Sequence, residues 1–273
     1  MTFDLSAYFA RIGVSASGPS SDALRAIQIG QMRAIPFENI APFLGEIPDL
    51  SPEAVWHKLI ASKRGGYCFE LNGLLGCALR ALRFPSRPIL ARVHMGAPAG
   101  GARTHLAWIV EADGTEWLVD AGFGGPGPLE PLRLTSQAEQ TVAGARFRLR
   151  AEPHNRERVL ERWKGEAWFS LYSFDEARVT TDDIEAANFY CARSDKSPFP
   201  DHLMMNSHGP EGSTGLFDRD LRIVQNGREA LETIGSKDDL RRHLAQRFRI
   251  DCGGPIVEAV WERLSRQSLQ KVA

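Results

Sequence analysis

Apolar residues recur at steps of three and four throughout residues 1–85, which is the periodicity of helices packed on a core. The longest run consists of Leu71, Leu74, Leu75, Ala78, Leu79 and Leu82. Shorter runs predict helices that begin near Asp4, near Ser21 and at Ser51, and the second of these ends before Pro36 because proline restricts the residue before it. The first third of the chain is therefore predicted to be a bundle of helices.

The pattern changes from residue 88 onwards, where apolar and polar residues alternate as they do in strands. Asp113-Gly114 is a strong signal for a tight hairpin between two of these strands. Strands are predicted at residues 88–95, 104–110, 116–120, 145–150, 158–164 and 166–172. Because no helical run separates these strands, they favour an antiparallel meander or small barrel over βαβ units.

The last third of the chain mixes both patterns. Thr181-Asp182-Asp183 is a capping sequence for a helix that ends near Cys191. Residues 194–215 are rich in Ser, Pro, Asp and Gly, which predicts a long loop. The remaining predicted elements are strands at residues 220–225 and 228–233 and helices that begin at Ser236 and Pro255.

The chain has 273 residues, of which 43% are hydrophobic and 25% are charged, as in ordinary globular proteins. Its net charge of −1 argues against nucleic acid or an anionic membrane surface as a partner. No run of about 18 apolar residues predicts a membrane span, and the first residues show no secretory signal. The four scattered cysteines form neither a disulfide framework nor a zinc motif, so we expect a cytoplasmic protein without a bound metal.

The first candidate for chemistry is Cys68, which follows Gly65-Gly66-Tyr67 where the longest helical run begins. Glycines allow a tight turn there, and the first turn of a helix offers unpaired N–H groups and the positive end of the helix dipole. These features favour a thiolate over a thiol, and the thiolate is the nucleophile. The alternative interpretation is a buried structural cysteine, which is the commoner role of a free cysteine.

Glu38 and Asn39 form a polar pair inside the apolar segment of residues 35–40. A buried carboxylate needs a partner, and Arg64 is the natural candidate because it precedes the glycine turn at Cys68. This pair would tie the two segments together. The alternative interpretation is a loop that exposes both polar residues to solvent.

The predicted hairpin brings His105 and Asp120 to one face of the sheet. With Asp113 and Gly114 as the two turn residues, Asp120 lies opposite Ala107, and His105 lies two positions further along. Diagonal neighbours of this kind are about 7–8 Å apart, within reach of a His–Asp hydrogen bond. A change of register by one residue would place them on opposite faces.

Cys68, His105 and Asp120 together would form an activated nucleophile, in which the histidine takes the thiol proton and the aspartate orients the histidine. Taken singly, His105 is also explained as a strand histidine and Asp120 as a turn or cap residue. The histidines that compete as the base are His94, His154, His202, His208 and His243, of which only His94 lies on one of the predicted strands. Residues 121–128, directly after Asp120, contain four glycines and two prolines. The amides of such a loop are able to hold a phosphate, although the loop is not a Walker A motif.

These motifs together closely resemble the arylamine N-acetyltransferases. The matching segments are Arg33-Ala34-Ile35-Pro36-Phe37-Glu38-Asn39-Ile40, Arg64-Gly65-Gly66-Tyr67-Cys68-Phe69-Glu70, Thr104-His105-Leu106 and Val119-Asp120-Ala121-Gly122-Phe123-Gly124-Gly125. They occur in the order of the family, and the chain length is similar to that of its bacterial members. Leu71 departs from the bacterial pattern, and Cys191 and residues 194–196 have no assignable counterpart, which bears on the shape of the pocket.

The resemblance implies an α+β fold with a cysteine-protease-like Cys-His-Asp core. Its three segments would be a helical bundle holding the nucleophile Cys68 (residues 1–86), an antiparallel β-barrel holding the base His105 and its orienting Asp120 (87–192), and an α/β lid (193–273). The implied reaction is a ping-pong transfer of acetyl from acetyl-coenzyme A, through a thioester on the cysteine, to an arylamine, hydrazine or arylhydroxylamine.

The same resemblance implies the binding residues. The amine pocket would be lined by Phe37, Tyr67, Phe69, Phe123 and Phe199, and coenzyme A would be approached by Thr104, Gly124, Gly125 and Gly127. Glu38 and Arg64 would support the site structurally. Acetyl-coenzyme A is implied as a co-substrate rather than a tightly bound cofactor, no metal is implied, and a homodimer is left open.

Two other functions compete with this one. A cysteine-dependent hydrolase of acyl groups or amides would use the same three residues, with water releasing the acyl group. A papain-type protease is disfavoured because His105 follows Cys68 by 37 residues, whereas about 130–150 separate them in that family. The second alternative is a non-catalytic protein that binds aromatic ligands or coenzyme A, against which the complete set of three residues argues.

Overall fold

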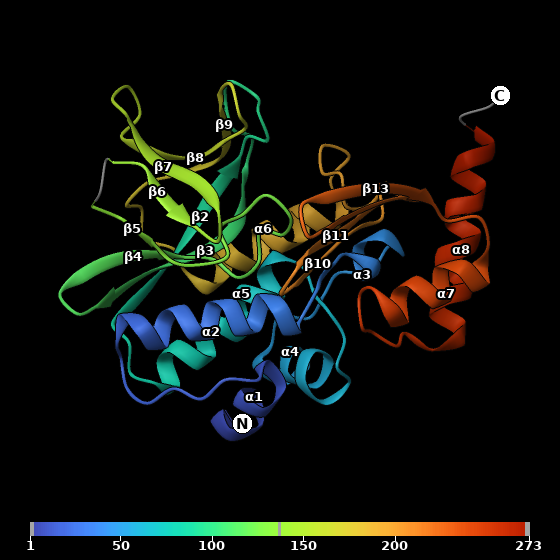
Figure 1. The fold of residues 1–273 in the computed structure, drawn as a ribbon, viewed down its shortest axis with the longest axis horizontal. Coiled ribbons are helices and arrows are strands. Elements are labelled where there is room, and N and C mark those ends of the chain that lie inside the picture. The colour runs from blue at the N-terminus through green and yellow to red at the C-terminus, as the bar shows by residue number, and fades with distance from the viewer. Residues whose placement is uncertain (1–2, 136–137, 271–273) are drawn as a thin grey trace.

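The structure is a computed structural model that describes residues 3–135 and 138–270. Its first third is helical, as predicted, and packs around α5, the helix that begins at Cys68 (Figure 1). The helices of this part are α1 (Leu5–Ile12), α2 (Ser21–Ala34), α3 (Ile40–Phe43), α4 (Pro52–Trp56), the π-helix η1 (His57–Ala61) and α5 (Cys68–Ala81). The apolar positions that predicted these helices lie in one buried cluster, which includes Tyr8, Leu24, Leu59, Leu75 and Leu79.

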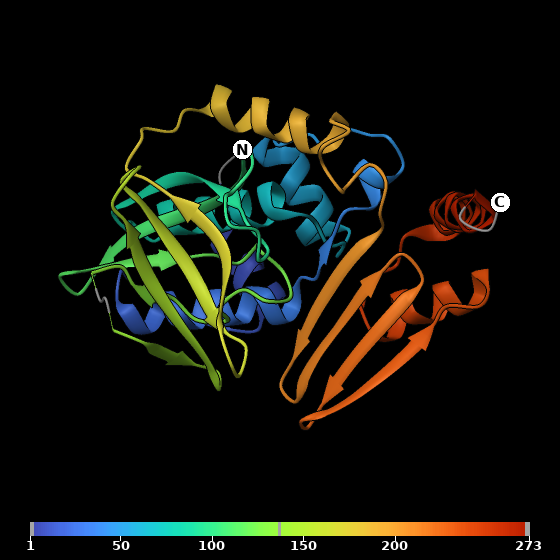
Figure 2. The same cartoon turned by 90° about the horizontal axis from the view of Figure 1, so that it is seen from above.

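The middle of the chain forms an eight-stranded antiparallel sheet that curves into a nearly closed barrel (Figure 2). Its strands are β2 (Ser86–Val93), β3 (Arg103–Ala112), β4 (Thr115–Val119), β5 (Leu132–Arg133), β6 (Gln140–Val142), β7 (Ala145–Glu152), β8 (Glu157–Trp163) and β9 (Trp168–Phe174), in the order β5-β4-β3-β2-β9-β8-β7-β6. The two edge strands meet through Gln140, whose side chain exchanges hydrogen bonds of 2.8 and 3.0 Å with the backbone of Arg133. Alternate side chains such as Ile89, Leu118 and Leu160 fill the interior.

The last part of the chain forms a second antiparallel sheet, with α7 and α8 on the face turned away from the barrel (Figure 2). Its elements are β10 (Met204–Gly209), β11 (Gly212–Phe217), β12 (Asp220–Gln225), β13 (Arg228–Thr233), α7 (Lys237–Gln246) and α8 (Gly253–Gln270). The helix α6 (Thr181–Arg193) connects the barrel to this sheet. Within residues 3–135 and 138–270, no helix is long and apolar enough to cross a membrane.

A short strand from the helical third ties the parts together. β1 (Phe37–Glu38) pairs with β10, so that Phe37 lies opposite Asn206 and Glu38 lies opposite Met205. The sequence pattern did not predict this strand, because two residues are too few to show an alternation.

The α+β fold predicted from the sequence is confirmed, but several elements differ. The predicted loop at residues 194–215 is wrong, because β10 and most of β11 lie within it. Glycines and small polar residues in this segment conceal the apolar alternation that predicts a strand. In the structure, β10 and β11 are each paired with a neighbouring strand on both sides, which holds them in the sheet. The short strands β5 and β6 were not predicted, and the helix expected to continue to Leu59 changes to a π-helix at His57. The proposed segment boundaries stay a prediction.

A cluster of two buried carboxylates and two partly buried cations supports the turn that precedes α5. The Glu38 carboxylate is fully buried and accepts a hydrogen bond of 2.7 Å from Arg64, which confirms the predicted pair and contradicts the exposed-loop alternative. Lys58 lies 3.7 Å from Glu38 and 2.8 Å from Glu70. Burial would raise the pKa of Glu38, but the charges of Lys58 and Arg64 outweigh burial and lower it.

Backbone contacts bring the glycine turn against the same strand. The Glu38 N–H donates to the Gly66 carbonyl at 2.9 Å. A Cβ atom on Gly65 would lie only 2.5 Å from the Pro36 carbonyl oxygen. Glycine is therefore required at position 65 by this close approach, which explains one half of the glycine pair seen in the sequence.

Glu38→Gln should destabilise the protein by about 2–4 kcal/mol, because it leaves the partly buried cations Lys58 and Arg64 with less compensating charge. Glu46→Gln is the matched control, since Glu46 is exposed in the loop after α3. Thermal or denaturant unfolding measures the difference. An unfolding midpoint that is the same for Glu38→Gln and the wild type would contradict a stabilising role for this cluster.

Candidate active site

Cys68 is the first residue of α5, as the sequence predicted, and its side chain is 3% exposed. The preceding Tyr67 caps the helix, and its N–H donates to the Glu70 carboxylate at 3.1 Å. The barrel side of the site approaches closely through Gly122, where a Cβ atom would lie 3.0 Å from the Cys68 Cα atom. The nucleophile candidate therefore lies at the junction of the helical part and the barrel.

The predicted hairpin register is confirmed. Trp108 pairs with Val119, and Asp120 follows directly at the end of β4. His105 and Asp120 lie on the same face, and the His105 Nε2 atom is 2.7 Å from an Asp120 carboxylate oxygen. The His105 ring also interacts with the Cys68 side chain, and this interaction lowers the pKa of the thiol. The structure thus brings the three predicted residues together in the order cysteine, histidine, aspartate.

The Asp120 carboxylate is held by further donors. One oxygen accepts hydrogen bonds from the Asn72 side chain (2.9 Å) and from the backbone N–H groups of Gly122 (2.9 Å) and Phe123 (3.1 Å). The oxygen that contacts the histidine also accepts from the Tyr172 hydroxyl at 3.0 Å. These contacts offset the cost of burying a carboxylate that is 1% exposed.

Asn72 and Tyr172 are site residues that the sequence analysis missed. Asn72 comes one helical turn after Cys68 on the same face of α5, and its amide also binds the backbone of Leu106 and Ala121. A polar residue on the apolar face of this helix could have indicated from the sequence that Asn72 has a partner in the buried site. Tyr172 belongs to an aromatic-rich strand segment, and nothing in its sequence context distinguishes it from a core residue.

The charges of the site depend on one another. Burial alone would lower the pKa of His105, but the Asp120 carboxylate outweighs burial and raises it to about 10. Burial raises the pKa of the Cys68 thiol, whereas its hydrogen bond with His105 and the charge of that ring lower it. The sequence predicted that the helix start would favour the thiolate, but burial opposes this. A thiolate on Cys68 therefore needs the imidazolium beside it.

The aromatic residues expected around the amine lie near one another. The Phe199 ring centroid is 6.1 Å from that of Phe37 and 5.8 Å from that of Tyr67, which in turn lies 5.4 Å from Phe69. Phe123 packs edge-on against His105 at 4.9 Å. Phe37 and Phe199 are only half-buried, whereas Tyr67 and Phe69 are buried, so the first two have the more accessible rings.

The residues expected near coenzyme A lie on both sides of Cys68. The Thr104 carbonyl accepts weak hydrogen bonds from the Cys68 thiol (3.7 Å) and from the Cys191 thiol (3.4 Å), so the unassigned cysteine is a neighbour of the nucleophile candidate. Gly124 has a positive φ of 83°, and its carbonyl accepts from the Gly127 N–H at 3.1 Å. Gly125, at the tip of this turn, is exposed.

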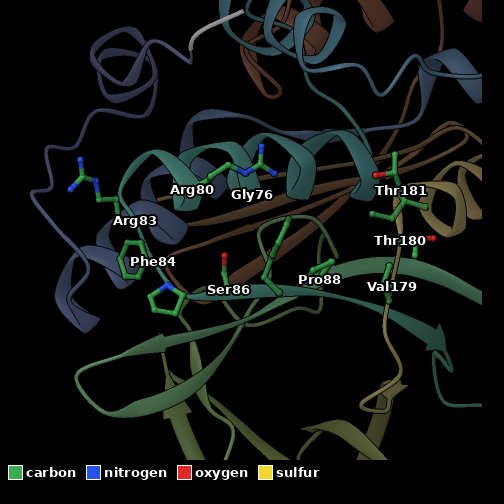
Figure 3. Close-up of a pocket in the computed structure, with 12 residues that line it drawn as sticks. Gly76, Arg80, Arg83, Phe84, Ser86, Pro88, Val179, Thr180 and Thr181 are labelled. Atoms are coloured by element: carbon green, nitrogen blue, oxygen red, sulfur yellow. The ribbon is translucent and has the colours of Figure 1, made fainter.

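A cavity of about 590 Å³ lies elsewhere, between the second half of α5, the start of β2 and the start of α6 (Figure 3). Gly76, Arg80, Ser86 and Thr181 are among its lining residues. Gly76 is about 12 Å along the helix axis from Cys68, so this cavity is separate from the candidate site. Among the described residues, no group of three or more His, Cys, Asp or Glu side chains is arranged to hold a metal ion.

Comparisons with known proteins agree with the geometry. A family model described as N-acetyltransferase matches residues 20–257. The arylamine N-acetyltransferase / N-hydroxyarylamine O-acetyltransferase of Salmonella typhimurium is 38% identical over 214 residues, which cover 78% of this chain and 75% of that protein. The arylamine N-acetyltransferase of Mycobacterium tuberculosis is 34% identical over 279 residues, with 98% of each chain covered.

Solved structures show the same fold. The structure of the Salmonella typhimurium arylamine N-acetyltransferase matches with a TM-score of 0.90 and 32% identity, covering 96% of this chain and 98% of that one. The Mycobacterium marinum arylamine N-acetyltransferase in complex with CoA matches with a TM-score of 0.89 and 31% identity, covering 96% and 99%. The chain belongs to the arylamine N-acetyltransferase family.

Proposed function

We propose that this protein transfers an acetyl group from acetyl-coenzyme A to an arylamine, hydrazine or arylhydroxylamine through a thioester on Cys68. The observation that carries the proposal is the buried His105–Asp120 pair of a barrel hairpin, joined at 2.7 Å, whose imidazole ring acts on the Cys68 thiol at a helix start. Membership of the family and a relative solved in complex with CoA support the choice of donor. Acetyl-coenzyme A is therefore a co-substrate, and free coenzyme A leaves after the first half-reaction.

In the first half-reaction, His105 accepts the Cys68 proton, and the thiolate attacks the carbonyl carbon of the acetyl thioester. The bond between that carbon and the coenzyme sulfur breaks, and His105 returns the proton to the departing thiolate. In the second half-reaction, the amine nitrogen attacks the acetyl-cysteine, His105 takes the proton of the amine, and the Cys68 thiol is released. Asp120 stabilises the imidazolium in both halves without taking a proton.

The pocket chemistry fits an aromatic acceptor. Arylamines are uncharged near neutral pH, so they enter an apolar site without the cost of desolvating a charge. Phe37 and Phe199 offer half-buried rings, and Phe123 places a ring beside His105, where the amine nitrogen has to lose its proton. These three residues are proposed as the acceptor pocket. The buried rings of Tyr67, which packs against Phe199, and of Phe69, which packs against Tyr67, would support it.

Compartment and assembly complete the proposal. Cys68, Cys77, Cys191 and Cys252 are all free thiols, which fits a reducing cytoplasm. Homodimer formation stays a prediction.

Mixing the protein with acetyl-coenzyme A and no amine should raise its intact mass by about 42 Da, the mass of one acetyl group on a covalent intermediate. Addition of an arylamine should remove the adduct, and Cys68→Ser should never form it. Cys77→Ser is the control, since Cys77 lies on the opposite side of the same helix. A full adduct on Cys68→Ser would reject the nucleophile, and coenzyme release without amine or adduct would favour the hydrolase.

Asp120→Asn should lower the acetylation rate by roughly three to four orders of magnitude, because the amide keeps the shape but not the charge that supports the imidazolium. Asp113→Asn, at the tip of the same hairpin, should retain the wild-type rate. Single-turnover release of coenzyme A measures both. Near-normal kinetics of a folded Asp120→Asn protein would contradict the assignment of Asp120.

A further inference from the structure

A second buried thiol lies beside the nucleophile candidate. The carbonyl oxygen of Thr104 accepts a weak hydrogen bond from the Cys68 thiol at 3.7 Å and another from the Cys191 thiol at 3.4 Å. Because both sulfur atoms lie within hydrogen-bond distance of one oxygen, the two cysteines are neighbours in the folded chain although they are far apart in the sequence. Cys191 belongs to the last turn of α6, so the pair joins the first turn of one helix to the last turn of another.

The pair is buried and separate from the other cysteines. Cys68 and Cys191 are 3% and 2% exposed and belong to one apolar cluster. Cys77 lies roughly 13 Å further along the axis of α5, and Cys252 belongs to the apolar cluster under the last sheet. Cys191 takes no part in the acetyl transfer proposed above, which leaves a buried thiol next to the nucleophile without an assigned role.

The two sulfur atoms differ in their chemistry. The Cys68 proton is within the reach of His105, and a thiolate on Cys68 is stabilised by the imidazolium beside it. Burial raises the pKa of Cys191 to about 12, so its side chain is a protonated thiol near pH 7. An activated thiolate is the group that peroxides oxidise, and a thiol beside it is able to condense with the oxidised sulfur.

We propose that Cys191 is the resolving thiol of Cys68, which closes a reversible Cys68–Cys191 disulfide when hydrogen peroxide oxidises the nucleophile. This inference rests on the proposed function, because it needs Cys68 as the activated sulfur. Acetyl transfer stops while the disulfide is present, and Cys68 is protected from irreversible oxidation to the sulfinic acid. Thiols of low molecular weight restore the enzyme by thiol–disulfide exchange.

The steps balance with hydrogen peroxide as the oxidant. The Cys68 thiolate attacks one peroxide oxygen and the O–O bond breaks. The released hydroxide takes the proton that His105 accepted from Cys68 and leaves as water, so that a sulfenic acid remains on Cys68. The Cys191 sulfur then attacks the Cys68 sulfur, the S–O bond breaks, and a second water leaves with the Cys191 proton. Each cysteine loses one electron, and the peroxide gains two.

The contacts around the pair favour this closure. A disulfide bond is about 2 Å long, so both side chains have to rotate about their Cα–Cβ bonds towards each other. The contacts that they give up are two thiol hydrogen bonds to the Thr104 carbonyl, which are weak. The backbone of Cys191 is held in place, since its carbonyl accepts from the Ser197 hydroxyl at 2.6 Å.

Peptide mapping after peroxide treatment tests the assignment. Hydrogen peroxide added to the wild type without acetyl-coenzyme A should lower the intact mass by about 2 Da and yield a linked Cys68–Cys191 peptide. Cys191→Ser, which keeps a donor to the Thr104 carbonyl, and Cys191→Ala should instead gain about 32 Da at Cys68, the mass of a sulfinic acid. Cys77→Ser is the matched control and should form the linked peptide as the wild type does.

Recovery of activity gives the second measurement. After peroxide and then dithiothreitol, the wild type should regain its rate of acetyl transfer, whereas both Cys191 variants should regain roughly threefold less of theirs. Equal recovery of wild type and variants, or peroxide-treated wild type without the linked peptide, would overturn the inference and leave Cys191 as a packing residue. Failure of the proposed function gives a different result, since untreated wild type would then transfer no acetyl, whereas the linked peptide is measured without any transfer.

Discussion

The Asp120 carboxylate is the charge on which the candidate site depends. A buried carboxylate is tolerated only when donors replace the water that it loses, and here donors come from α5, β3, β9 and the loop after β4. Because one group binds four parts of the chain, its position fixes the helical part against the barrel. The same contacts keep it ionised, which is the state that supports a positive His105. Both the stability of the fold and the chemistry of the site therefore require an ionised carboxylate at Asp120.

A second buried group of charges has a different purpose. Glu38, Arg64, Lys58 and Glu70 lie around the turn before α5 and include none of the three triad residues. The Glu70 carboxylate accepts from the N–H of Tyr67, the residue before Cys68, and the backbone N–H of Glu38 donates to the Gly66 carbonyl, so the segment that carries this cluster positions the backbone before Cys68. The nucleophile candidate is thus oriented by salt bridges on one side and approached by His105 on the other. Because the charge cluster and His105 lie on different sides of Cys68, the buried thiol keeps its orientation towards His105.

The sequence predicted those parts of the site whose positions depend on neighbouring residues in the chain. The glycine turn and the helical run located Cys68, and Asp113-Gly114 fixed the register that joins His105 to Asp120. Contacts between distant segments were not predictable in this way. β1 consists of two residues and exists because β10 pairs with it, and Asn72 and Tyr172 meet Asp120 only in the folded chain. The raised pKa of Cys68 was also missed, because burial is a property of the whole packing.

The C-terminal part belongs to the site rather than only covering it. The Asn39 amide donates to the carbonyls of Phe199 (3.0 Å) and His202 (2.8 Å), and its oxygen accepts from the Met204 N–H at 2.7 Å. One buried side chain thereby holds the segment that carries Phe199 beside Phe37. Because β10 continues from this segment to Asn206, whose side chain lies beside Gly125, the last part of the chain borders both the proposed acceptor pocket and the glycine loop. A chain without the last sheet would keep Cys68, His105 and Asp120 but lose the strand β10 that pairs with Phe37 and Glu38.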